Sequence, residues 1–149
     1  MRAIVQRVRW ARVTVEGKVV GRCGLGLLAL VGAHKDDTER EASRLAEKLA
    51  HLRVFNDEAG KMNLALGDLP ASDEPQLLAV SNFTVYGDTE GNRRPSFTNA
   101  APYERGKELF EAFLAALARL GVRAESGVFG AHMDVELLND GPVTVIVDA

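Results

Sequence analysis

The sequence lacks several features that mark common protein classes. One cysteine, Cys23, among 149 residues excludes a framework of internal disulfides and fits a reducing compartment. The longest apolar run, 25–31, contains Gly26 and is far shorter than the roughly 20 residues of a membrane-spanning helix. Strand-like residues follow Met1 at once, without the apolar segment of a secretory signal. We therefore expect a cytoplasmic protein with no membrane contact.

Motifs for cofactors, metals and the commonest hydrolases are also missing. The chain has no phosphate loop, no dinucleotide-binding glycine pattern and no zinc-spaced cysteines and histidines. His34, His51 and His132 are scattered, which is typical of surface residues rather than metal ligands. No serine lies in a nucleophile-elbow pattern. We expect no metal and no cofactor, and a hydrolase of this sequence would lack an obvious histidine-based triad.

The length and charge limit the architecture and the partners. A chain of 149 residues with 46% hydrophobic and 26% charged residues predicts one globular domain, residues 1–149, with a substantial core. A net charge of -3 argues against broad, non-specific binding of nucleic acid. It leaves room for a small basic patch that meets one end of an RNA.

Two helices are predicted by their termination signals and apolar spacing. Thr38 and Glu41 form a capping-box pattern before an apolar stripe that ends near Leu52. A second helix begins near Pro102 and is stopped by Gly121. Outside the two predicted helices, short apolar runs predict strands. These are 3–9, 12–15, 18–21, 24–32, 52–55, 62–66, 76–85, 122–125, 127–129, 131–138 and 143–148.

The order of these elements predicts the fold class. The first strands follow one another closely, with a hairpin turn at Glu16-Gly17, so they should be antiparallel. Segments 67–74 and 86–101 lack periodicity and are predicted to be loops, and long loops in compact domains are often functional. We predict an α+β domain with a mostly antiparallel sheet and two packed helices. Periodicity does not decide whether the sheet closes into a barrel.

The stretch 139–144, Asn-Asp-Gly-Pro-Val-Thr, joins the last two predicted strands. Asp140-Gly141 suits a tight turn, but Pro142 lacks an N–H at the first position of a strand. The Gly141-Pro142 bond is of the kind that adopts the cis form at low cost, about 0.5–1 kcal/mol. Two interpretations follow: a simple turn, or a constrained backbone that presents its carbonyl oxygens.

The stretch 81–87, Ser-Asn-Phe-Thr-Val-Tyr-Gly, places two hydroxyls and an amide at the end of a predicted buried strand. Burying such groups is costly unless they are hydrogen-bonded. Regular strand alternation puts Asn82 and Thr84 on one face, and Ser81 and Phe83 on the other. These groups either belong to a site or satisfy neighbouring backbone at the strand end.

These two stretches together resemble the signatures of the D-aminoacyl-tRNA deacylases, the D-Tyr-tRNA deacylase family. The similarity extends along the chain to segments 1–8, 60–63, 93–97 and 127–130. Two positions depart from the family pattern: Asn82 stands where glutamine is usual, and Val85 where leucine is usual. The amide of Asn82 has a shorter reach than that of glutamine.

The resemblance implies a homodimer that hydrolyses the ester between a D-amino acid, or glycine, and the 3′-terminal ribose of the tRNA CCA end. It also implies a cis Gly141-Pro142 bond whose two carbonyls enter the partner's pocket and bind the substrate ammonium group, thereby excluding L-amino acids. Phe129 and Met133 would line the pocket. The ribose 2′-hydroxyl would assist catalysis beside the backbone amides of Phe83 and Thr84, with a Thr84 nucleophile as the alternative.

The resemblance implies supporting roles for five further residues. Asn139 and Thr144 belong to the second signature, and Arg7 would brace the Gly-Pro segment, unless it is an ordinary exposed strand arginine. Arg93 and Arg94 would bind phosphates of the CCA end, unless they are a solvated charge pair. Two rival functions are a non-catalytic dimeric module that binds aminoacyl-adenosine ends, and a relative that edits L-alanine through a trans Gly-Pro bond.

Overall fold

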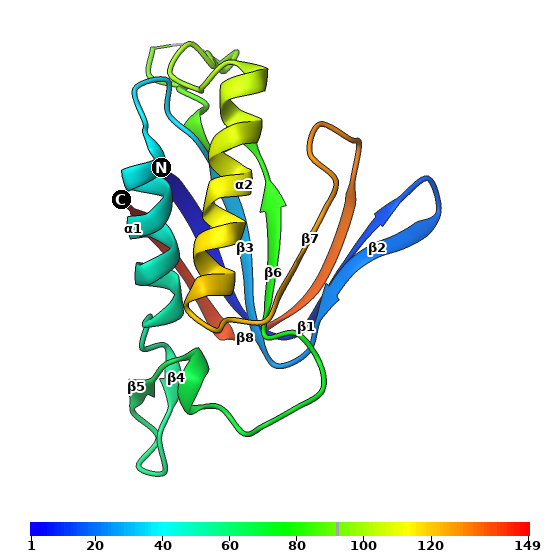
Figure 1. Ribbon diagram of the computed structural model, residues 1–149, viewed down its shortest axis with the longest axis vertical. Coiled ribbons are helices and arrows are strands. Elements are labelled where there is room, and N and C mark those ends of the chain that lie inside the picture. The colour runs from blue at the N-terminus through cyan, green and yellow to red at the C-terminus, as the bar shows by residue number, and fades with distance from the viewer. Residues whose placement is uncertain (92) are drawn as a thin grey trace.

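The structure, a computed structural model, describes residues 1–91 and 93–149. Within these residues, two α-helices pack against one face of a six-stranded mixed sheet, and a separate two-stranded hairpin lies beyond α1 (Figure 1). The predicted α+β class is confirmed. No helix of the described chain combines the length and apolarity needed to cross a membrane. Asn92, inside the predicted loop 86–101, lies outside the described residues.

Strand β1 (Arg2–Val15) is the centre of the sheet. One of its edges pairs antiparallel with β3 (Gly26–Gly32) through residues 2–8 and with β2 (Lys18–Cys23) through residues 11–15. The predicted strands 3–9 and 12–15 are therefore one strand. The predicted hairpin turn is confirmed, since Glu16 (φ 49°) and Gly17 (φ 77°) take left-handed conformations between β1 and β2.

The sheet is mixed because each helix serves as a crossover. β6 (Leu77–Ser81) lies parallel to β3 after α1, and β7 (Ala124–Ser126) lies parallel to β6 after α2. A parallel pair needs a long return connection, which a helix supplies. The expectation of mostly antiparallel pairing thus holds for β1 and its neighbours and fails for the second half of the sheet.

The two ends of the sheet path, β2 and β7, meet on the far side from the helices. The Arg22 backbone N–H donates to Glu125 Oε2 at 2.7 Å. A Cβ at Gly21 would lie 2.6 Å from the Ser126 carbonyl oxygen, so only glycine permits this approach. The sheet is therefore nearly closed and barrel-like, which settles what periodicity left open.

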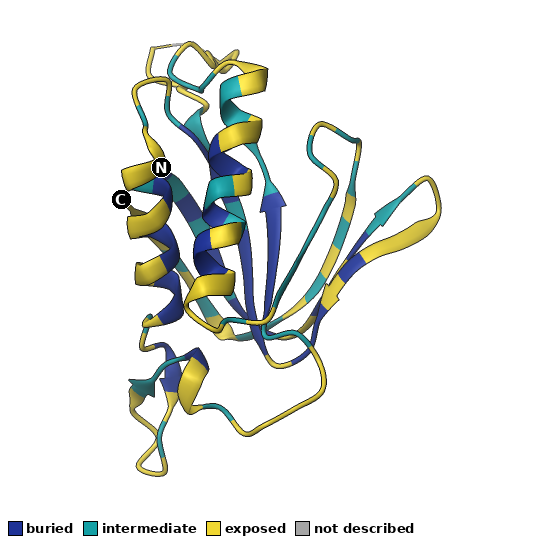
Figure 2. Ribbon diagram, in the orientation of Figure 1, coloured by how far each residue is buried: buried dark blue, intermediate teal, exposed yellow. Residues whose placement is uncertain are grey.

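Both predicted helices form where their signals lie. Thr38 caps α1 (Glu39–Ala50) through a complete capping box with Glu41, and α2 (Tyr103–Arg119) follows Pro102. Gly121 takes a left-handed φ of 78° just after α2. Figure 2 shows that each helix buries the face turned toward the sheet and exposes the other.

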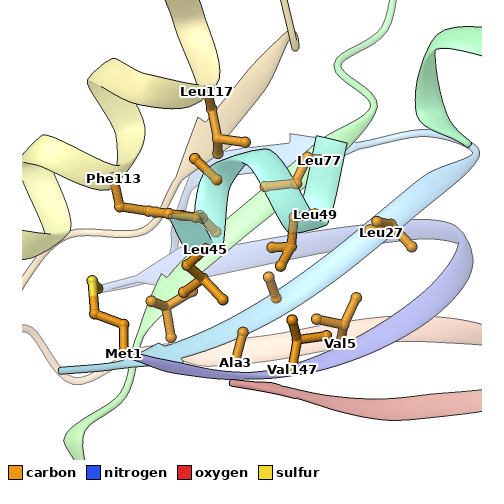
Figure 3. Packing of buried hydrophobic residues seen from close by; sticks show 14 of the residues in the cluster. Met1, Ala3, Val5, Leu27, Leu45, Leu49, Leu77, Phe113, Leu117 and Val147 are labelled. Atoms are coloured by element: carbon orange, nitrogen blue, oxygen red, sulfur yellow. The ribbon is translucent and has the colours of Figure 1, made fainter. Parts of the chain in front are cut away.

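The described residues form two hydrophobic cores, one on each face of the sheet. The larger core lies under the helices, where Leu45, Leu49, Phe113 and Leu117 pack against sheet residues such as Leu27 (Figure 3). The second lies inside the curl of the sheet and contains Val8, Leu28, Leu78, Val80 and Cys23. Burial raises the pKa of the Cys23 thiol to about 12, so it remains a neutral thiol.

Several short elements differ from the expectation. The hairpin consists of β4 (Phe55–Asn56) and β5 (Met62–Leu64), so of the predicted strand 52–55 only Phe55 is a strand residue. A 3₁₀ turn, η1 (Leu66–Asp68), replaces the end of strand 62–66. The predicted strand 127–129 and the first residues of 131–138 are irregular. Such short apolar runs are ambiguous because neighbours, rather than propensity, decide their pairing.

Candidate active site

Of the two interpretations of the stretch 139–144, the simple turn is wrong. β8 (Asp134–Asp148) runs straight through this stretch and pairs antiparallel with β1 on both sides of it. Between the pairs Gln6↔Thr144 and Val8↔Asn139, β8 advances five residues while β1 advances two. Residues 140–143 therefore bulge out of the ladder without reversing the chain. Glycine and proline mark bulges as well as turns, and only the pairing distinguishes the two.

Asn139 replaces the ladder hydrogen bonds that the bulge removes. Its Nδ2 donates to the carbonyl oxygens of Arg7 and Val143, each at 3.0 Å. Just beyond the bulge, Gln6 Nε2 donates to Thr144 Oγ1 at 3.2 Å. Buried backbone acceptors are costly to leave unpaired, so these side chains fix the shape of the bulge.

Arg7 lies buried behind the bulge, with 8% of its surface exposed. The alternative of an exposed strand arginine is therefore wrong. Its Nε donates to the Asp140 carbonyl at 3.1 Å, and its Nη1 donates to the Val54 carbonyl at 2.7 Å. The Asp140 carboxylate lies 3.3 Å from the same Nε and compensates the buried charge. Arg7 thus connects the bulge to the segment before β4.

Gly141 and Pro142 are exposed at the tip of the bulge, and the peptide bond between them is cis. Gly141 has a φ of 134°, which residues with a side chain rarely adopt. A Cβ there would lie 2.8 Å from the Val143 backbone nitrogen and 3.2 Å from Arg7 Nη2. Within the described ladder, residues 140–143 have no partner on β1.

The first signature forms a strand end followed by a 3₁₀ turn, rather than a continuous strand to residue 85. β6 ends at Ser81, and η2 (Phe83–Tyr86) follows. Asn82 caps this turn: its Oδ1 accepts hydrogen bonds from the Thr84 backbone N–H at 3.1 Å and from Thr84 Oγ1 at 2.5 Å. The predicted alternation of faces beyond Ser81 is therefore wrong, because side-chain capping ends the strand.

A cavity of about 810 Å³ opens beside this turn. Phe129 and Met133 line it together with residues 81–84 of the first signature. The Gly141-Pro142 tip is not part of its lining, so the two signatures do not meet at this cavity within the chain. Among the other lining residues are Gln6, Ala101, Tyr103, Gly106, Gly130, Ala131 and His132.

No signal in the sequence indicated the contribution of α2 to this cavity. Tyr103 and Gly106 line it from the first turn of the helix, whose apolar spacing predicted only the buried face. His132 also lines the cavity, with 97% of its side chain exposed. Arg93 and Arg94 lie exposed in the loop 86–101 and are not among the lining residues. Two isolated bridges, Asp88↔Ser96 and His34↔Ala100, give that loop some structure.

The first signature offers hydrogen-bond donors but no general base. The Thr84 hydroxyl donates to a carboxamide oxygen, which does not remove a proton at neutral pH. Burial raises the pKa of the Tyr86 phenol to about 12, so it stays neutral. The Thr84 N–H is occupied by Asn82, whereas the Phe83 N–H finds no acceptor among the described residues. Residues 81–84 of the cavity wall can therefore stabilise a developing negative charge, but they include no group that would activate a nucleophile.

Known proteins and a family model match this chain over nearly its whole length. A family model described as D-Tyr-tRNA(Tyr) deacylase matches residues 4–148. The D-aminoacyl-tRNA deacylase of Carboxydothermus hydrogenoformans is 55% identical over 148 residues, which is 99% of each chain. That of Thermus aquaticus is 53% identical and covers 100% of this chain and 95% of the relative. A solved structure named c-Myc DNA Unwinding Element Binding Protein is 35% identical, with a TM-score of 0.89, and covers 100% of this chain and 99% of that one.

Proposed function

The chain belongs to the D-Tyr-tRNA(Tyr) deacylase family, and we propose that it hydrolyses the ester bond of D-aminoacyl-tRNA and of glycyl-tRNA, releasing the free amino acid and tRNA. The observation that carries this proposal is the cavity wall formed by residues 81–84. This wall presents a backbone donor and a capped threonine without any base. Such a site suits an ester substrate that brings its own activating group.

The ammonium group of the substrate is bound by the carbonyls of Gly141 and Pro142 from the partner of a homodimer. These residues are exposed, lie outside the cavity of their own subunit and have no partner in the described ladder. An ammonium has three donors and no acceptor, so two fixed carbonyl oxygens hold it without a charged side chain. Glycine at position 141 lets the backbone approach closely.

The same arrangement distinguishes D- from L-amino acids. Once the ammonium and the ester are both fixed, the Cα hydrogen and the side chain have only two positions available. A backbone wall at the L position excludes an L side chain and accepts a hydrogen. Glycine and many D-amino acids therefore fit, and L-amino acids clash.

Hydrolysis proceeds with the tRNA supplying the activating group. The 2′-hydroxyl of the terminal ribose assists water in attacking the ester carbonyl, and the 3′-hydroxyl leaves with a proton. The Phe83 N–H stabilises the oxyanion of the tetrahedral intermediate. The Asn82 cap fixes the turn that aims this donor. Arg93 and Arg94 contribute by contacting phosphates of the CCA end. The enzyme acts on tRNA in the cytoplasm.

Deacylation of matched substrates tests this function. We expect rapid release of D-tyrosine from D-Tyr-tRNA, release of glycine from glycyl-tRNA, and no release of L-tyrosine from L-Tyr-tRNA. A tRNA ending in 2′-deoxyadenosine should bind and remain charged. Binding of D-Tyr-tRNA without turnover would instead identify a non-catalytic module for aminoacyl-adenosine ends. Hydrolysis of L-alanyl-tRNA alone would identify an editing relative of opposite preference.

A further inference from the structure

Exposed aromatic side chains gather around the mouth of the cavity. Tyr103 has 60% of its surface exposed, Phe83 has 57% and Phe97 has 38%. Tyr103 and Phe83 line the cavity itself. Figure 1 shows the loop that carries Phe97 at the same end of the molecule as the start of α2, where Tyr103 lies. Exposing large aromatic rings together is unfavourable unless a ligand covers them.

The two outer rings, those of Tyr103 and Phe97, each pack against another ring that lines the cavity. Tyr103 packs edge-on against Phe129, with ring centroids 5.2 Å apart and planes at 74°. Phe97 packs against Phe83 in the same way, at 5.1 Å and 75°. Edge-to-face packing leaves one partner's face available for a further stacking contact. The rings are thus oriented and still open to solvent.

Two glycines let the outer rings approach the backbone. A Cβ at Gly130 would lie 2.5 Å from the Tyr103 hydroxyl oxygen, and a Cβ at Gly87 would lie 2.9 Å from Phe97 Cε1. Any other residue at either position would push the ring away. The local backbone therefore fixes both rings beside the cavity, which reduces the entropy lost when a ligand stacks on them.

We propose that Tyr103 and the Phe83–Phe97 pair form a stacking platform for the nucleobases that precede the terminal adenosine of the RNA substrate. This inference rests on the proposed function. A cavity of about 810 Å³ is of the size that holds one small ligand, and a terminal aminoacyl-nucleoside is such a ligand. The preceding nucleotides then lie outside the cavity, over its rim. Aromatic side chains there bind bases of any identity through their faces.

The charge of the chain supports stacking as the main contact. A net charge of -3 gives no broad electrostatic attraction to RNA. The exposed Arg93 and Arg94 lie in the same loop as Phe97 and are available for phosphate contacts, although Asp88 and Glu90 leave the loop without net charge. A few basic residues beside aromatic rings form the usual combination at sites for single-stranded nucleic acid.

Comparing two substrates isolates this platform from the catalytic site. The first is D-Tyr-tRNA, and the second is 3′-O-D-tyrosyl-adenosine, which has the same ester and lacks the preceding nucleotides. For Tyr103→Ala and Tyr103→Leu we expect KM for the tRNA to rise about fivefold or more, which corresponds to the loss of one stacked base. Because Tyr103 also lines the cavity, KM for the adenosine ester should rise as well, but by a clearly smaller factor than KM for the tRNA. Tyr103→Phe keeps the ring and should behave as the wild type on both substrates.

Trp10→Ala is a matched control, because Trp10 is an exposed aromatic residue that does not line the cavity. It should change neither KM. A second measurement uses an uncharged CCA-ended RNA with 2-aminopurine in the penultimate position. Wild-type protein should quench its fluorescence, and Tyr103→Leu should not.

Three results would overturn the platform. Equal increases in KM for both substrates would make Tyr103 part of the catalytic pocket, and unchanged KM for both would remove it from RNA binding. A change of oligomeric state in Tyr103→Leu, with loss of activity on both substrates, would place the rings in a contact between copies of the chain. Failure of the wild-type protein to hydrolyse either substrate would instead refute the proposed function.

Discussion

Thr84 and Asn82 form a single hydrogen-bonded unit at the cavity wall. The Asn82 carboxamide oxygen accepts from both the backbone N–H and the hydroxyl of Thr84. The Thr84 hydroxyl therefore donates its hydrogen bond to a neutral amide oxygen, which is not a base. A nucleophilic threonine requires a neighbouring base, and the described contacts of Thr84 include none. The side chain of Thr84 is better suited to shaping the turn than to attacking an ester.

We expect Thr84→Ala to retain kcat within about tenfold of the wild type, whereas loss of a true nucleophile costs on the order of 10⁶-fold. Single-turnover deacylation of D-Tyr-tRNA measures this directly. Thr84→Ser, which keeps the hydroxyl, is the matched control. Complete loss of turnover in Thr84→Ala with unchanged tRNA binding would restore the nucleophile hypothesis.

Gly141 is the residue whose conformation most restricts substitution in the bulge. Its φ of 134° disfavours any side chain, and a methyl group on its Cα would lie 2.8 Å from the Val143 nitrogen. Any replacement must displace the bulge or Arg7 behind it. The position of the Gly141 and Pro142 carbonyls therefore depends on glycine at position 141 as well as on the contacts of Arg7 and Asn139.

We expect Gly141→Ala to lower kcat/KM by about 100-fold or more, since each hydrogen bond to a charged group contributes about 1.5–3 kcal/mol. Gly121→Ala is the matched control: Gly121 also has a left-handed φ, 78°, but no atom lies within 4 Å of its Cβ position. It should lower Tm and leave kcat/KM unchanged. Similar activity in the two variants would argue against a substrate contact at Gly141.

At the scale of elements, α1 begins at a capping box that is also a pH-sensitive contact. Hydrogen bonds from the Thr38 hydroxyl and backbone N–H, with Arg40 beside them, lower the pKa of Glu41 to about 2. The ionised carboxylate is therefore favoured in the folded state relative to the unfolded chain. This contribution is complete above a pH of about 4.5 and is lost as the pH falls toward 2.

We expect Glu41→Gln to flatten the acid limb of the stability curve. The Tm difference between wild type and variant should be largest above pH 5 or so and should shrink as the pH falls through the interval from 4.5 to about 2. Thr38→Ala should lower Tm at neutral pH by roughly 2–4 °C, as for the loss of one helix cap. Thermal melts across pH measure both. A constant Tm difference at every pH would contradict the role of the Glu41 charge.

At the scale of the whole molecule, the two signatures belong to different surfaces. Residues 81–84 line the cavity beside α2, whereas Gly141 and Pro142 are exposed on the bulge of β8. Because one subunit does not unite them, the proposed mechanism needs a second copy related by symmetry. In a twofold dimer, each subunit would give its bulge to the other's cavity and receive one in return.

Mixing two inactive variants tests this arrangement. Gly106→Leu should block the cavity, since Gly106 lines it and faces Phe129. Gly141→Ala should disable only the bulge. After subunit exchange, half of the dimers are mixed and each has one intact site, so about one quarter of the wild-type activity should return. Activity that stays at the level of the separate variants would show that both signatures act within one subunit.

The helices and the hairpin at Glu16-Gly17 could be predicted from the sequence because their signals are local. A capping box, a stop glycine and apolar residues at helical spacing act within a few positions of one another. The bulge could not be predicted this way. Asp-Gly-Pro is equally compatible with a turn and with extra residues in a strand, and the choice depends on pairing with β1, far away in sequence. The same holds for the parallel pairing of β3 with β6, which depends on where α1 packs.

The sequence by itself predicted which residues belong to the candidate site, because residues 81–87, apart from Asn82 and Val85, and residues 139–144 resemble the family signatures in the linear chain. It also determined that histidine or metal chemistry has no motif here. Tertiary structure alone decided how those residues are arranged. Capping by Asn82 ended β6 early, the buried Arg7 and Asn139 shaped the bulge, and the start of α2 brought Tyr103 to the rim of the cavity. Most of these contacts join residues that are distant in sequence, so no local pattern encodes the arrangement.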